Sequence, residues 1–105
     1  MKPSFFKKLG PLNINQIKKI INCETHSIEN NTEYYELASL KTATKSTDIT
    51  FVYDNEKLIP KTLKEPTIIC TKQKYNELKN NFKLLIVEDV QKTIAILSNC
   101  FYREL

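Results

Sequence analysis

The sequence predicts an α/β domain, in which helices flank one mixed or parallel sheet, and three observations indicate this class. Short apolar runs alternate with amphipathic segments from residue 49 onward, the order in which crossover helices join parallel strands. The run LLIV at 84–87 is the most hydrophobic in the chain and is typical of a central strand. The 105 residues are the size of one ordinary domain, so we expect residues 1–105 to form a single unit.

Strand composition marks four segments, which are rich in β-branched and aromatic residues. The expected strands are 34–40, 49–53, 67–71 and 84–87. Polar segments separate them, and we expect loops at 25–33 and 41–48. Leu58, Ile59 and Leu63 fit a short helix or a turn, because Pro60 interrupts this stretch.

Amphipathic periodicity marks three helices, which are expected at 14–23, 73–80 and 90–102. Asn13 or Asn15 can cap the first of them, and Asp89 can cap the last. In the last helix the apolar residues recur at intervals of three and four, which predicts one buried stripe: Val90, Ile94, Leu97 and Phe101.

Composition restricts the class of protein. No stretch approaches the roughly 18 to 20 apolar residues of a membrane span, and the N-terminus lacks the apolar core of an export signal. Cys23, Cys70 and Cys100 stand far apart in apolar surroundings without a CxxC spacing, so we interpret them as reduced core residues. A soluble cytoplasmic protein without a membrane span is therefore expected. His26, the only histidine, has no metal or catalytic motif around it and is expected in a loop.

The net charge of +4 raises the question of nucleic-acid binding. Fifteen of the sixteen basic residues are lysine, and Arg103 is the only arginine, although arginine makes most base-edge and bidentate phosphate contacts. The chain also contains ten asparagines and twelve isoleucines, a bias that AT-rich codons alone produce. We therefore do not expect nucleic acid as the main partner and keep it as a third hypothesis.

The stretch DITFVYDNEKLI contains the most informative turn. Ile49, Phe51 and Tyr53 alternate with smaller residues until Asp54 and Asn55 break the strand. In parallel sheets, ligands bind outside the carboxyl ends of strands, and this turn occupies such a position. The alternative interpretation is an ordinary turn beside core aromatic residues.

The order of several short motifs resembles one known family. FFKKLGPLNINQI, LASLKTA, DITFVYDNEKL, TIIC and LLIVEDVQKTIAIL..FY follow one another as they do in the N-terminal domain of UDP-3-O-acylglucosamine N-acyltransferase, a bacterial enzyme of lipid A biosynthesis. The resemblance runs nearly end to end. It implies a uridine-binding domain whose architecture is similar to the nucleotide-sugar-binding domains of Mur ligases.

The resemblance also implies a uracil site. In the family, a strand aromatic residue and a tyrosine stack on the base and an asparagine contacts it. Phe51 matches the strand aromatic residue and Asn55 the asparagine, while the tyrosine position falls on Leu58. Because one extra residue precedes the turn, Tyr53 can supply a ring instead. Glu56 replaces the proline of the motif.

The sequence ends at Leu105, before the hexapeptide-repeat β-helix that carries catalysis in the family. We therefore expect a non-catalytic domain that is inactive alone, binds UDP-3-O-acylglucosamine or a uridine nucleotide weakly, and uses no cofactor or metal. A separate hexapeptide-repeat acyltransferase chain is a candidate partner. The main alternative is a protein-interaction module that keeps the fold without the nucleotide site, and the leucine at position 58 favours it.

Overall fold

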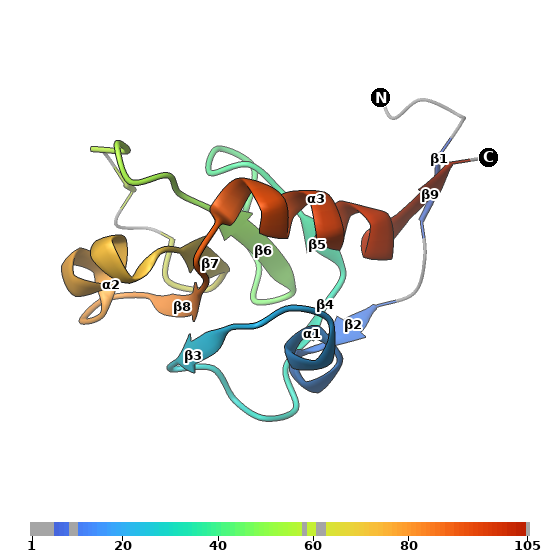
Figure 1. The fold of residues 1–105 in the computed structure, drawn as a ribbon, viewed down its shortest axis with the longest axis horizontal. Helices are drawn as coiled ribbons and strands as arrows, with labels where there is room; N and C mark the ends of the chain where they lie inside the picture. Colours follow the sequence, from blue (N-terminus) through green and yellow to red (C-terminus); the bar gives the residue numbers. More distant parts are fainter. Residues whose placement is uncertain (1–5, 9–10, 58, 61–62, 105) are drawn as a thin grey trace.

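The computed structural model describes residues 6–8, 11–57, 59–60 and 63–104 of the chain. It is a small α/β domain with a five-stranded mixed sheet and helices on both of its faces (Figure 1). The strands of this sheet, in spatial order, are β3 Glu24–His26, β8 Lys83–Ile86, β7 Thr67–Cys70, β6 Asp48–Phe51 and β5 Glu36–Leu37. The four strands β5 to β8 are parallel, and β3 pairs antiparallel with β8. This confirms the expected class.

Two short antiparallel pairs stand outside the main sheet. Their strands are β1 Phe6–Lys8 with β9 Tyr102–Glu104, and β2 Leu12–Asn13 with β4 Glu33–Tyr34. The first pair lies beyond the end of the long C-terminal helix, where residues 6–8 and 102–104 lie side by side (Figure 1).

Three helices complete the fold. They are α1 Ile14–Ile20, α2 Lys72–Leu78 and α3 Val90–Phe101. Local capping explains where they begin. The Asn13 side chain accepts from the Gln16 N–H at 2.9 Å while Gln16 accepts from the Asn13 N–H, a capping box. Asp89 accepts from the Lys92 N–H at 3.0 Å, as expected.

Alternation along the strands divides the core between the two faces of the sheet. Ile49, Ile69 and Leu85 point to the face that α1 and α3 cover. Ile68 and Leu84 point to the opposite face, which α2 covers. All four residues of β7 are buried, as expected for a strand covered on both sides. The stripe of α3 is also confirmed, since three of its four residues are buried and Ile94 is half-buried.

Several expectations were wrong in detail. Residues 24–26 form strand β3 rather than a loop, because they pair with β8, and His26 therefore lies on a strand. The expected strand 34–40 is divided between β4 and β5, which belong to different sheets. Helix α1 ends at Ile20 because Ile21 takes an extended conformation. Between β6 and β7 the described residues form the turn that was one of the two expected alternatives, with the Leu63 N–H donating to the Pro60 carbonyl at 3.1 Å, and Leu58 lies outside the described residues.

Candidate functional site

The predicted aromatic residues lie at the carboxyl end of β6. Phe51 is the last residue of the strand, is half-buried and packs against the core under α1 and α3. Tyr53 follows on the departing segment with 40% of its surface exposed. The two ring centroids are 5.8 Å apart with an interplanar angle of 69°, an edge-to-face pair. The strand itself ends two residues earlier than predicted, but the two rings still meet.

The turn after Tyr53 is bonded to helix α2. Thr71 directly follows β7 and caps α2, and its hydroxyl donates to the Asp54 carboxylate. The Lys74 ammonium donates to the carbonyl oxygen of Glu56. Within the turn, the Glu56 N–H donates to the Tyr53 carbonyl at 3.0 Å. Strand β6, its turn and the start of α2 therefore form one connected unit.

Lys74 is unusual because its side chain is almost fully buried, with an exposed fraction of 6%. Its ammonium forms an ion pair with Glu77 at 2.8 Å in addition to the bond with the Glu56 carbonyl. A buried charge requires such partners, since its desolvation is costly. The side chain is therefore held in place as a brace between α2 and the turn.

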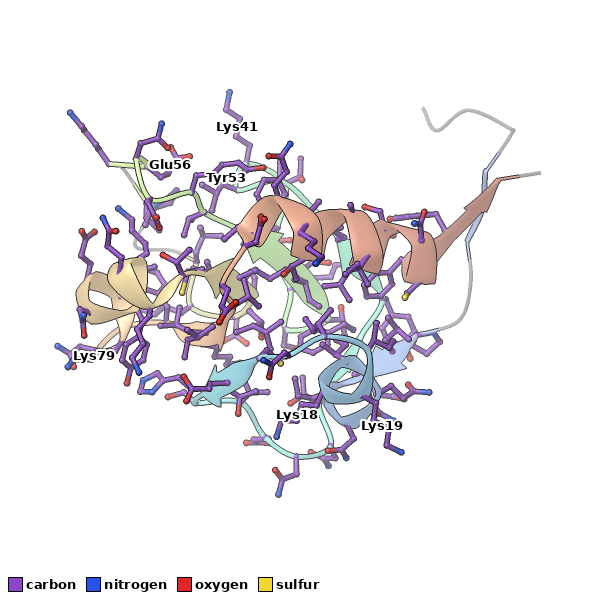
Figure 2. All side chains as sticks on the ribbon, viewed as in Figure 1. Lys18, Lys19, Lys41, Tyr53, Glu56 and Lys79 are labelled. Carbon is purple, nitrogen blue, oxygen red and sulfur yellow. The ribbon has the colours of Figure 1, made fainter. Side chains whose placement is uncertain are left out.

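Two predicted site residues remain, Asn55 and Leu58, and the structure describes only the first of them. Asn55 is exposed at the tip of the turn, on the segment that carries Tyr53 and Glu56 at the periphery of the molecule (Figure 2). Leu58 lies outside the described residues, so its distance from the rings is not defined. Sequence reasoning missed Thr71 and Lys74. A threonine between a strand and a helix is a recognisable cap, whereas nothing in the sequence marks Lys74.

The thiol nearest this turn is not a nucleophile. Burial at the end of β7 raises the pKa of Cys70 to about 12, and the charge of Asp54 adds to the effect. Burial also raises the pKa of Cys23, against the opposing charge of Lys18. Thiols in this state stay protonated at neutral pH and are unreactive. Only Cys70 is fully buried, so the expectation of three core cysteines holds for one of them, although all three are free.

His26 has a structural partner. Its Nε2 lies 2.6 Å from the carbonyl oxygen of Lys79, the residue that follows α2. Its ring meets the edge of Tyr75 at a centroid distance of 5.3 Å. Among the described residues there is no group of three or more His, Cys, Asp or Glu that could hold a metal ion. The histidine thus joins β3 to α2.

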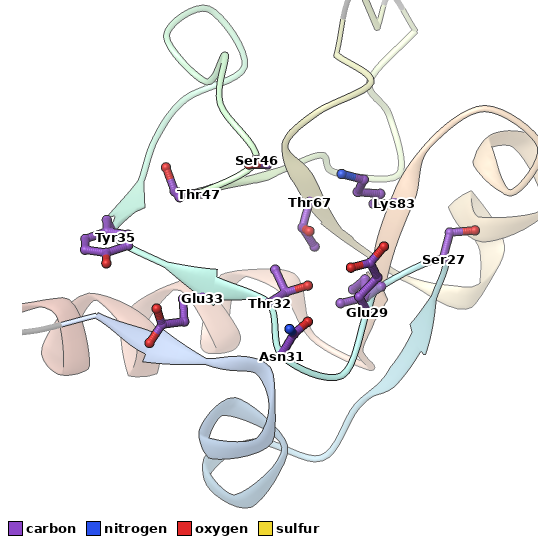
Figure 3. Close-up of a pocket in the computed structure, with 11 residues that line it drawn as sticks. Ser27, Glu29, Asn31, Thr32, Glu33, Tyr35, Ser46, Thr47, Thr67 and Lys83 are labelled. Carbon is purple, nitrogen blue, oxygen red and sulfur yellow. The ribbon is translucent and has the colours of Figure 1, made fainter.

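Four cavities have been mapped on the described part of the molecule, and Phe51, Tyr53 and Asn55 line none of them. The largest, about 450 Å³, opens at the amino ends of β6, β7 and β8, opposite to the turn (Figure 3). A second, of about 420 Å³, lies between the end of α1 and the start of α3. The largest of these cavities thus lies at the opposite ends of the strands from the predicted site, whereas the second lies beside the segment that follows β8.

The four lysines labelled in Figure 2 do not lie on one surface. Lys18 and Lys19 extend from α1, Lys41 from the loop between β5 and β6, and Lys79 from the end of α2, on different sides of the molecule (Figure 2). A nucleic-acid site requires lysines and arginines on one face. Within the described part of the chain, no helix is long and apolar enough to cross a membrane.

Comparison with known proteins gives no family. No family model matches the sequence, and no curated protein matches it.

Proposed function

We propose that the chain is a non-catalytic uracil-recognition domain, of the type found at the front of UDP-3-O-acylglucosamine N-acyltransferase, with an architecture similar to the nucleotide-sugar-binding domains of Mur ligases. The observation that carries the proposal is the exposed Tyr53 ring, held edge-to-face on Phe51 at the carboxyl end of a parallel strand. Asn55, on the same turn, is exposed and supplies both a donor and an acceptor for a base.

The bracing of the turn supports this proposal. A ring that is already held against a second ring loses little conformational freedom when a base stacks on it. Thr71 and Lys74 hold the segment that carries Asn55, so the ligand does not have to order the backbone of this turn. The site is thus largely formed before a nucleotide arrives.

The affinity should nevertheless be modest. Stacking of one base on an aromatic side chain contributes about 1 to 3 kcal/mol, whereas association costs several kcal/mol in lost translational and rotational freedom. Leu58 offers contact area but no planar face on the second side of the base. We therefore expect UMP or UDP to bind with a Kd of roughly millimolar order.

Titration of labelled protein with UMP, followed by amide chemical shifts in NMR spectra, tests the proposal. Shifts should centre on Phe51, Tyr53 and Asn55, and AMP should bind less well. Tyr53→Ala, a change at an exposed side chain, should abolish the shifts without unfolding the sheet. Phe51→Ala should do the same, and Leu58→Tyr should tighten binding by restoring a second ring. If UMP at about ten millimolar moves no resonance near Phe51, the proposal is wrong.

A second expectation concerns catalysis. The proposed domain recognises the nucleotide end of UDP-3-O-acylglucosamine and leaves acyl transfer to another polypeptide segment, with a separate hexapeptide-repeat acyltransferase chain as a candidate partner. Incubation of the chain alone with an acyl carrier protein thioester and this substrate should give no N-acylated product. Product formation would contradict the proposal.

One observation favours a different class, a protein-interaction module. The polar groups of the turn are already used inside the protein, since Asp54 bonds to Thr71 and the Glu56 carbonyl bonds to Lys74. A turn built for packing against α2 has this property as well. If UMP produces no shifts in the titration, the protein-interaction module becomes the favoured hypothesis.

A further inference from the structure

The largest mapped cavity lies at the amino ends of the parallel strands, opposite to the ends that carry the proposed uracil site. It opens where β6, β7 and β8 begin, whereas the turn after Tyr53 follows the end of β6. Its volume of about 450 Å³ falls within the range of roughly 300 to 1,000 Å³ typical of ligand pockets. Figure 3 shows Thr67 and Thr32 near its middle, with Tyr35 beside Thr47 at one end and Ser27 at the other.

The walls of this cavity are fixed by backbone hydrogen bonds. The Thr47 carbonyl accepts from the Tyr35 N–H at 2.8 Å, which ties the two sides of one end together. The Thr32 carbonyl accepts from the Ile14 N–H at 2.9 Å, which ties the opposite wall to the first residue of α1. The buried Asp48 carboxylate accepts from two backbone N–H groups of the preceding loop at 2.9 and 3.0 Å. The cavity is thus preformed.

The deepest polar contact of the cavity is a buried hydroxyl pair. The Tyr34 hydroxyl lies 2.8 Å from Thr67 Oγ1, and both side chains are almost fully buried. Burial raises the pKa of Tyr34, so this phenol keeps its proton. Either hydroxyl can donate this hydrogen bond, and a hydroxyl donates one hydrogen bond and accepts two. Thr67 therefore keeps hydrogen-bonding capacity for a ligand in the cavity.

The charges around the cavity exclude an anionic ligand. Among the described residues that line the cavity, Glu29 and Glu33 contribute two carboxylates, whereas Lys83 contributes the single cation. The Lys83 ammonium is moreover only 4.0 Å from the Glu65 carboxylate and 3.3 Å from the Glu65 carbonyl oxygen. A phosphate or a nucleotide would therefore meet net negative charge.

The remaining lining favours a neutral, polyhydroxylated ligand. Six hydroxyl groups line the cavity, from Ser27, Thr32, Tyr35, Ser46, Thr47 and Thr67. A hydroxyl donates one hydrogen bond and accepts two, as do the hydroxyl groups of a sugar, and carboxylates accept from them. Ile28 is the one aliphatic side chain among the described lining residues, which does not favour a ligand such as an acyl chain.

Tyr35 supplies an aromatic face at the rim of the cavity. It is one of the large side chains that remain exposed, at 41% of its surface, and it lies at the rim of the cavity (Figure 3). The negative face of an aromatic ring attracts the positively polarised C–H groups of a pyranose. We propose that this cavity binds a neutral pyranose sugar, whose C–H face packs on Tyr35 while its hydroxyl groups bond to Glu33, Thr47 and Thr67. This site is independent of the proposed uracil site.

Titration of the labelled full chain with D-glucose, D-galactose and D-mannose in turn, followed by amide chemical shifts, tests this proposal. At least one sugar should give saturable shifts at Thr32, Glu33, Thr47 and Thr67, with a Kd in the millimolar range. Tyr35→Ala should weaken the binding at least tenfold. The matched control is Tyr53→Ala, which removes a tyrosine of similar exposure at the opposite edge and should leave sugar binding unchanged. Glu33→Gln should weaken the binding less than Tyr35→Ala does.

Three results would overturn the sugar site. The first is the absence of saturable shifts at the cavity with all three sugars. The second is binding that Tyr35→Ala leaves intact, and the third is a response to inorganic phosphate or to an alkylammonium ion in place of a sugar. UMP serves as the internal reference in the same experiment. A response to UMP without one to sugar rejects only this inference, and the converse rejects only the proposed uracil site.

Discussion

The two ends of the parallel strands use their polar groups in opposite ways. At the carboxyl ends, α2 supplies partners for the turn after β6, through Thr71 and Lys74. At the amino ends, hydroxyl groups from several loops surround a cavity of about 450 Å³. The difference arises because β7 leads directly into α2, whose first turn lies against the neighbouring turn. The turn after β6, at the usual location of ligands in parallel sheets, is thus braced, and the largest mapped cavity lies at the opposite ends of the strands.

This comparison separates two ways of forming a site. We call the two ends of the parallel strands the carboxyl edge and the amino edge. The carboxyl edge presents one exposed ring on a rigid turn, which suits a flat ligand such as a base. The amino edge presents a volume with many hydrogen-bonding groups, which suits a compact polar ligand. Substitutions and pH changes directed at one edge should therefore leave the other edge unchanged.

Alkaline pH should produce the largest loss of stability. The loss should begin with the ionisation of Cys70 at the carboxyl edge. Burial raises the pKa of Cys70 from 9.0 to about 12, so its contribution to stability is complete below pH 9 and is lost as the pH rises towards 12. The free energy of unfolding should fall by up to about 1.4 kcal/mol per pH unit in this window. At the amino edge, the raised pKa of Tyr34 adds a loss only above its ordinary value of 10.0.

Urea unfolding at a series of pH values measures this loss. The pKa of Cys23 is also raised by burial, so the experiment uses a Cys23→Ser background. In that background, Cys70→Ala should remove the loss that begins near pH 9 and leave the loss that begins near pH 10. A free energy of unfolding that stays level up to about pH 11 would show that the thiol is not held protonated by the fold.

The hydroxyl pair at the amino edge provides the next prediction. Thr67→Val keeps the shape of the side chain but leaves the Tyr34 hydroxyl without its partner, in a position with no exposed surface. The expected loss is about 1 to 3 kcal/mol of unfolding free energy, the cost of a buried unpaired polar group. Thr67→Ser, which retains the hydroxyl, is the control and should lose less. If Thr67→Val costs under about 0.5 kcal/mol, water reaches Tyr34 through the cavity.

The sequence predicted those elements whose signals are local. Strand β7 is recognisable by its apolar, β-branched composition. Helix α3 is recognisable by its apolar periodicity and by Asp89, which caps its first turn. Strand β3 carries no such signal, because Glu24, Thr25 and His26 are polar and become a strand only by pairing with β8. The division of 34–40 between two sheets likewise depends on partners distant in the sequence.

The same limit applies to the sites. Phe51, Tyr53 and Asn55 could be placed at a strand end from the sequence, because alternation followed by a polar turn is a local pattern. The contacts of Thr71 with Asp54 and of Lys74 with Glu56 span 17 and 18 residues and could not be predicted. The amino-edge cavity could not be predicted either, since its lining comes from several separate segments that only the sheet brings together.

The last prediction has the smallest effect and tests the brace at the carboxyl edge. Thr71→Val removes the hydroxyl that donates to Asp54 and that accepts from the Lys74 N–H at 3.4 Å. Loss of a helix cap costs about 1 kcal/mol, and a partly exposed position should not exceed this value. Thr71→Ser keeps the hydroxyl and is the matched control.

Hydrogen exchange of backbone amides shows which segments Thr71→Val destabilises. Because the brace holds the turn to α2, Thr71→Val should accelerate exchange at Glu56 and in the first turn of α2. The Tyr35 amide, whose partner is the Thr47 carbonyl at the amino edge, should exchange as before. Equal acceleration at both edges would mean that the sheet transmits the disturbance and that the two edges are not independent. Unchanged exchange at Glu56 would instead mean that Lys74 alone holds the turn, and UMP binding should then survive the substitution.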